Sequence, residues 1–145
     1  MANDLVKMDY AAEFLRGWPN SSSAYSAELD RFELASGVDV ENGDLVVINS
    51  SGKVVLATTE VDNAGIVVRG VETKDVAKNR RPVILWGAYI VRTTKFSGSV
   101  APMAKVNAIA GVFQPATTAA HMGTVLQVNP ATPGVQAANI IVRVA

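Results

Sequence analysis

The residues of this chain that could do chemistry are few and widely spaced. His121 is the single histidine, and a catalytic triad would need it to lie beside a carboxylate and a nucleophile. No aspartate or glutamate occurs after Asp75, so only folding could bring an acid to it. The chain has no cysteine, which removes thiolate nucleophiles and cysteine-based metal sites. We therefore interpret His121 as a loop residue beside Met122 and predict no catalytic residue.

An acidic group around one turn resembles, at first sight, a calcium site. Asp39, Glu41 and Asp44 flank the dipeptide Asn42-Gly43. Their spacing does not match the alternating ligands of a calcium-binding loop, whereas an Asn-Gly pair before an apolar run is typical of a β-hairpin. We interpret the group as a polar turn, and we predict neither a metal nor a cofactor.

One run of basic residues could contact an acidic partner. It spans positions 74–82, and its cations are Lys74, Lys78, Arg80 and Arg81. Exposed ion pairs contribute ~0.2–1 kcal/mol each, so such a run would steer docking more than hold it. The alternative is a solvated loop between two strands. No aromatic residue accompanies the run and the formal net charge is zero, so we predict no nucleic-acid partner.

The first 28 residues differ from the rest and are predicted to form an N-terminal arm. Asp9 can cap a short helix that ends at Gly17, because most of the residues between them are good helix formers. Two helical turns are not stable alone, so this helix must lie on a surface. That surface belongs either to its own domain or to a neighbouring subunit or shell. The expected contact residues are Phe14, Leu15 and Trp18.

Residues 29–145 are predicted to form one all-β domain. Its apolar runs are short, rich in β-branched residues and separated by turn residues, which is typical of an antiparallel β-sandwich or barrel. No helical period of ten residues occurs after Gly37. The expected strands cover 31–34, 45–48, 54–57, 65–71, 82–92, 105–108, 112–114, 123–128 and 139–144.

A strand–turn–strand unit occurs twice in this domain, at about 43–71 and 102–130. Both copies read glycine, four residues and Ala-Thr-Thr, and a second glycine then opens another strand. The first copy has Gly52, Ala57-Thr58-Thr59 and Gly65, and the second has Gly111, Ala116-Thr117-Thr118 and Gly123. We interpret this pattern as an internal pseudo-repeat, since chance similarity between two β-rich hairpins would not preserve all of it.

Composition limits the class of protein. The chain has 145 residues, of which 49% are hydrophobic and only 18% are charged, and its mean hydropathy is +0.22. That length is sufficient for one domain with a real core. So few charges predict surface that is hidden in an assembly. The first ten residues have two acids and no apolar run, and no apolar stretch reaches membrane length, so we expect neither a signal peptide nor a membrane span.

Three segments of the domain resemble the head decoration, or structural cement, proteins of tailed bacteriophages. They are residues 32–49, 52–57 and 64–71, and the likeness is a rhythm of glycine, valine and small residues over about 30–145. The resemblance implies a non-enzymatic protein made in the host bacterial cytoplasm. It implies docking as a dimer or trimer on the capsid exterior of the virion, across the seams between major capsid protein subunits. It assigns no role to any single residue.

Two other classes remain open. A carbohydrate- or receptor-binding β module of a virion fibre or tail would need exposed aromatics, and only Trp86 and Tyr89 could serve. A small enzyme would need a carboxylate whose pKa is strongly perturbed in an apolar pocket. The absence of any recognisable catalytic motif favours the structural role.

Overall fold

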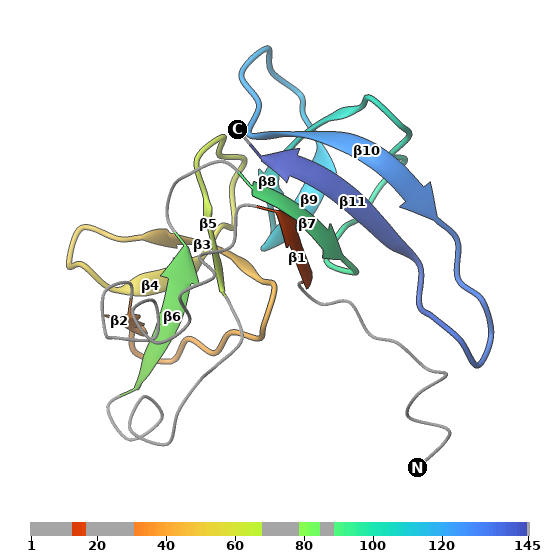
Figure 1. Ribbon diagram of the computed structural model, residues 1–145. Helices are drawn as coiled ribbons and strands as arrows, with labels where there is room; N and C mark the ends of the chain where they lie inside the picture. The colour runs from red at the N-terminus through yellow and green to blue at the C-terminus, as the bar shows by residue number, and fades with distance from the viewer. Residues whose placement is uncertain (1–12, 17–30, 68–78, 85–88, 145) are drawn as a thin grey trace.

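Figure 1 shows the fold, taken from a computed structural model of the chain. The structure describes residues 13–16, 31–67, 79–84 and 89–144. All regular secondary structure in these ranges is β, as the sequence predicted, and they contain no helix. The strands are β1 (Glu13–Arg16), β2 (Arg31–Glu33), β3 (Leu45–Ile48), β4 (Val54–Leu56), β5 (Gly65–Val67), β6 (Arg80–Ile84), β7 (Tyr89–Thr93), β8 (Lys105–Ile109), β9 (Val112–Pro115), β10 (Gly123–Asn129) and β11 (Asn139–Val144).

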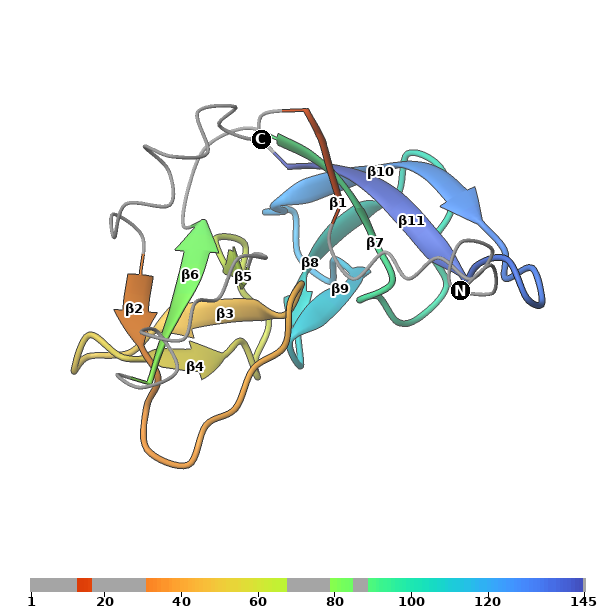
Figure 2. The same cartoon turned by 60° about the horizontal axis from the view of Figure 1, so that its bottom comes forward.

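The strands form two antiparallel sheets that lie side by side (Figures 1 and 2). The first sheet has the strand order β2-β6-β5-β3-β4, and the second has the order β1-β7-β11-β10-β8-β9. Within the described part of the chain neither sheet closes on itself, so the barrel alternative is wrong. The sheets meet where β3 contacts β8.

The two sheets are copies of one arrangement. Without β1, the second sheet has the order β7-β11-β10-β8-β9, which is the order of the first sheet with every strand number raised by five. The registers agree as well. Val46 on β3 lies opposite Leu56 and Gly65, and Val106 on β8 lies opposite Pro115 and Gly123. The duplicated unit therefore has five strands, and we call β2–β6 the first repeat and β7–β11 the second repeat.

The edge strand of each repeat is covered in the same way. Leu34 forms a parallel bridge to Val54 on β4, and Phe96 forms a parallel bridge to Phe113 on β9. The next residue along the chain then donates a backbone hydrogen bond to that strand in both repeats, at 3.0 Å in the first and 2.9 Å in the second. These segments occupy backbone groups that would otherwise be open for pairing with another chain.

Each repeat buries an equivalent row of side chains on one face of its sheet, which we call the front face. Four strand positions carry this row in both repeats. They are Val46, Val54, Val67 and Val83 in the first repeat and Val106, Phe113, Val125 and Val142 in the second. All eight side chains are at most 1% exposed. The loop before β3 covers the front face of the first repeat with Val40.

The opposite, back face of the first sheet packs on the front face of the second. Leu45 and Ile66 point to this side, are fully buried and share one core with the second repeat. Backbone hydrogen bonds join the repeats along the same seam. The Leu45 amide donates to the Gly111 carbonyl at 2.8 Å, and Val61 and Ala108 exchange two bonds of 3.0 and 3.1 Å. Both faces of the first sheet are thus covered.

The predicted N-terminal helix is wrong over the residues that the structure describes. Glu13–Arg16 form strand β1, which pairs with β7 through Glu13 opposite Arg92 and Arg16 opposite Ile90. A two-turn helix gains little on its own, whereas a strand here completes the hydrogen bonds of the β7 edge. This part of the arm therefore lies on the domain's own sheet.

The long strand expected over 82–92 is also wrong, because two strands replace it. β6 belongs to the first sheet and β7 to the second, with 85–88 outside the described residues. The boundary between the two repeats falls inside this apolar run. A period-two pattern shows that residues are extended, but it does not show which sheet they join.

Candidate functional site

The two repeats carry different side chains on their back faces. In the first repeat Leu45 and Ile66 lie on this face, and Ile84 is the register partner of Ile66 on β6. The matching register in the second repeat holds Lys105, Thr124 and Arg143. Leu45 and Ile66, which the second repeat covers, are thus replaced by Lys105 and Thr124, and the position of Ile84 is taken by Arg143. We call Lys105, Thr124 and Arg143 the cationic row.

The cationic row forms a small pocket with the loop before β10. Thr124 is only 4% exposed, because it lies between two long side chains on the neighbouring strands β8 and β11. Lys105 Nζ donates to Thr124 Oγ1 at 3.2 Å. His121, Met122 and Gly123 complete the lining of a pocket of about 110 Å³. Lysine, histidine, arginine and threonine side chains thus surround one opening.

The charges of this pocket are not balanced by acids. The second repeat has four cations and no aspartate or glutamate. Arg92 is neutralised by Glu13 of β1 at 3.3 Å, and Lys95 by acids of the first repeat. Lys105 and Arg143 form no ion pair with any described residue. The two uncompensated cations of the repeat therefore flank the same threonine.

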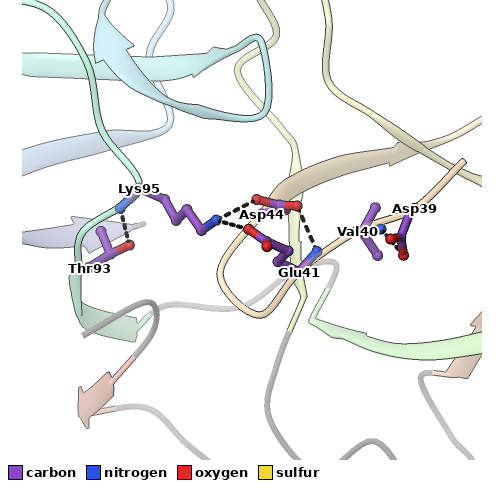
Figure 3. A network of polar contacts seen from close by, with 6 residues as sticks. All are labelled: Asp39, Val40, Glu41, Asp44, Thr93 and Lys95. Atoms are coloured by element: carbon purple, nitrogen blue, oxygen red, sulfur yellow. Dashed lines mark hydrogen bonds and ion pairs between the residues drawn. The ribbon is translucent and has the colours of Figure 1, made fainter. Parts of the chain in front are cut away.

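Lys95 ties the two repeats together (Figure 3). It reaches from the segment after β7 to the loop before β3, where its Nζ lies 2.7 Å from Glu41 Oε1 and 3.3 Å from Asp44 Oδ1. The Glu41 amide also donates to Asp44 Oδ2 at 2.7 Å. The hydrogen bond and the charge of Lys95 lower the pKa of Glu41. Burial would lower the pKa of Lys95, but its contacts with Glu41 and Asp44 outweigh burial and raise it.

The acidic group around Asn42-Gly43 is thus part of an inter-repeat contact rather than a simple solvated turn. No set of three or more histidine, cysteine or acidic side chains converges on a metal position within the described ranges. Among the same residues there is also no helix that could span a membrane.

A second polar contact joins the two Ala-Thr-Thr loops. Glu60, which follows the first loop, accepts hydrogen bonds from Asn107 Nδ2 at 2.7 Å and from the Thr117 amide at 2.9 Å. The Thr117 hydroxyl donates to the other carboxylate oxygen. These bonds from Asn107 and Thr117 lower the pKa of Glu60. This role of Glu60 is not visible in the sequence, because the second Ala-Thr-Thr loop has no acidic residue at the equivalent position.

The predicted contact residues that the structure describes lie on two different sheets. Leu15 is 42% exposed and is an extra residue at a β-bulge of β1, and Phe14 on the same strand lies opposite Val91. Trp18, Lys74 and Lys78 lie outside the described residues. Arg80 and Arg81 do not lie in a loop as expected. They belong to β6, opposite Glu33 and Phe32 of β2, and so to the first sheet, away from the cationic row.

The carbohydrate-binding alternative depends on the aromatic residues Trp86 and Tyr89. Tyr89 is 5% exposed and packs in the core, so it offers no platform for a sugar ring, and Trp86 lies outside the described part of the chain.

Leu126, like Leu15, is an extra residue at a bulge, and it is 39% exposed on β10. These two leucines are thus exposed apolar side chains at the bulges of β1 and β10 in the second sheet.

The signal for the cationic row was present in the sequence but incomplete. The absence of acids after Asp75 was visible, yet Lys105 and Arg143 are 38 positions apart and only the sheet register brings them to one threonine. Comparison of this chain with models of known families, with curated proteins and with solved structures finds no match. The function must therefore be argued from this geometry.

Proposed function

We propose that the protein is a non-enzymatic decoration, or cement, protein that docks on the outside of a tailed-phage head and stabilises contacts between major capsid protein subunits. The observation that carries the proposal is the back face of the second sheet. It corresponds in register to a buried inter-repeat face, but Lys105 and Arg143 are exposed on it and have no acidic partner among the described residues. A surface of that kind fits an acidic protein surface.

In this proposal the protein is a rigid, sandwich-like wedge. The back face of the first sheet packs on the front face of the second, and the Lys95 and Glu60 contacts fix the two repeats against each other. The back face of the second sheet is then the docking side. Leu15 and Leu126 add apolar contacts at the bulges, and the arm residues Phe14 and Trp18 extend them.

The stabilising effect would be distributed over many copies. A pair of exposed ion pairs contributes on the order of 1 kcal/mol, which is too little to hold one copy alone. Association into a dimer or trimer that bridges a capsid seam multiplies such contacts through effective concentration. We place the protein in the virion, on the capsid exterior, after synthesis in the host bacterial cytoplasm.

The titratable groups support a non-enzymatic role. The described groups whose pKa is shifted are Glu41, Glu60 and Lys95, and each shift follows from bonds that join the two repeats. None of the three lies in an enclosed apolar pocket, where a catalytic acid or base is usually found.

The test is the number of copies of this chain per particle in purified virions of its source, measured against the major capsid protein by quantitative mass spectrometry. A ratio of one, or a simple fraction of one, is expected for a protein on the shell lattice. Absence, or a few copies per particle, would reject the proposal. Binding to emptied shells adds a second test, in which K105E/R143E should abolish binding and K53E on the first sheet should not.

The alternative is a carbohydrate- or receptor-binding module of a fibre or tail. One observation favours it, namely a shallow pocket of about 290 Å³ beside the first Ala-Thr-Thr loop, with carboxylate and amide groups that could bind sugar hydroxyls. Its lining is Glu60, Val61, Asp62, Asn63, Asn107 and Thr118, and it has no aromatic side chain. Binding on a glycan array that N63A removes would support this alternative.

A further inference from the structure

We propose that the cationic row is a binding site for a single oxyanion group, either a carboxylate or a free phosphate or sulfate. The inference rests on the proposed function and deepens it, because it names the chemical group of the partner that the cationic row would bind during docking. It also makes a claim about the isolated protein that can fail or succeed without a phage shell.

The first argument is the duplication itself. At equivalent registers the first repeat has Leu45 and Ile66, both fully buried, and the second has Lys105 and Thr124. A repeat whose back face is not covered by another described sheet needs only polar side chains there to stay soluble, and scattered uncharged side chains would serve. Here the replacements are two like charges placed on either side of one threonine, an arrangement that repels itself unless an anion joins it.

The second argument is donor geometry. β8 and β11 both neighbour β10, so the backbones that carry Lys105 and Arg143 are about 10 Å apart, and their long side chains can reach one group above Thr124. Because Thr124 Oγ1 accepts a hydrogen bond from Lys105, its own proton remains to be donated. Arginine supplies a planar pair of donors that matches two oxygens of an oxyanion, and lysine supplies a point charge.

The third argument is electrostatic. The acids that come from outside the second repeat are already bound, Glu13 by Arg92 and Glu41 by Lys95. Glu60, beside the same loop as His121, is held by Asn107 and Thr117. Glu13, Glu41 and Glu60 are therefore engaged elsewhere and do not compete with an incoming anion for the cations of the pocket.

The experiment uses the full chain and its single histidine. The Cε1–H signal of His121 and the amide signals of Gly123 and Thr124 are followed by NMR at fixed pH and fixed ionic strength. Sodium phosphate replaces sodium chloride in one titration and sodium acetate replaces it in another. We expect a saturable shift at these three residues. Saturation with phosphate alone identifies a phosphate-type ligand, and saturation with acetate identifies the carboxylate of an acidic side chain.

Matched variants assign the effect to the row. K105M and R143M retain the aliphatic stems and should each weaken binding at least tenfold, with R143K intermediate. K53M removes a lysine that is paired with Glu33 on the first sheet, so it should leave the binding curve unchanged. Unfolding midpoints of all four variants show that the fold is kept. Linear shifts without saturation, or equal effects of K53M and K105M, would overturn the anion site. The cationic row would then serve only to keep this face of the sheet soluble.

The two proposals fail separately. Saturable anion binding by a protein that is absent from virions would leave the site standing and remove the capsid role. Shell binding that K105M and R143M do not change would leave the role standing and remove the site.

Discussion

Met103 occupies in the second repeat the position that Gly43 occupies in the first. Met103 lies two positions before β8, and Gly43 lies two positions before β3. Both residues have a left-handed backbone, with φ of 73° at Met103 and 91° at Gly43. Each amide donates to the equivalent valine carbonyl, Met103 to Val125 at 2.7 Å and Gly43 to Val67 at 2.8 Å. The duplicated turn therefore keeps its geometry although one copy has lost the glycine that suits it.

This relationship predicts that M103G stabilises the protein. A left-handed conformation costs a side-chain-bearing residue roughly 1–2 kcal/mol, and the greater freedom of glycine in the unfolded chain returns about half of that. Met103 is 67% exposed, so little packing is lost. We expect the free energy of unfolding in urea to rise by about 0.5–1 kcal/mol. A101G in the same loop, where the backbone is not left-handed, should lower it, and a loss with M103G would contradict the assignment.

K95M should destabilise the protein and weaken the coupling of the two repeats. The change leaves Asp44, whose side chain is only 13% exposed, without its cation. The free-energy cost of a partly buried carboxylate without a partner exceeds the free energy that its ion pair contributed. We expect a decrease of a few degrees in the thermal midpoint, on the order of 1 kcal/mol. K53M is the matched control because its partner Glu33 is half exposed, and it should be close to neutral.

Glu60 predicts a dependence of stability on acid. Folding lowers its pKa, so as pH falls the unfolded chain takes up a proton before the folded one does. The contribution of this carboxylate is complete above its ordinary value of about 4.5 and is lost as pH falls below it. E60Q should therefore be less stable than the parent at pH 7, and the difference should shrink at pH 3. D62N, which changes an exposed neighbour, should follow the parent at both pH values in urea unfolding.

Gly123 should not tolerate even a methyl group. A Cβ at this position would lie 2.7 Å from Val142 Cγ1 and 3.2 Å from the Arg143 carbonyl oxygen, both on the paired strand β11. We expect G123A to lower the free energy of unfolding by about 1–3 kcal/mol. Unchanged stability would show that the two strands can separate at this end, and the cationic row would then be less well fixed than we propose.

The sequence predicted the hairpins β3–β4 and β8–β9 and the strands that follow them well, because their turns carry strong local signals. The Ala-Thr-Thr loops and the glycines at 52 and 111 mark the hairpins in both copies. The strands β6 and β11 were not recognised as equivalent, because they share no such marker and each pairs on one side with residues 47 to 55 positions away.

The errors in the prediction have one physical source. A short segment such as Glu13–Arg16 has too few residues for local propensity to decide, and the open edge of β7 decides instead. The cationic row was missed for a related reason. A lysine at 105 or an arginine at 143 is ordinary in the sequence, and only the strand registers show that Lys105 and Thr124 take the positions of the buried Leu45 and Ile66.

The position of β11 has a consequence for synthesis. β11 lies between β7 and β10 in the middle of the second sheet, yet it is the last described strand to leave the ribosome. The first sheet is complete once β6 has emerged and can form during translation. The second sheet cannot be completed until residues 139–144 have emerged. The edge of β7 that pairs with β11 therefore stays unpaired while β8, β9 and β10 are synthesised. During that interval the nascent chain is most exposed to aggregation, and chaperone binding would be concentrated there.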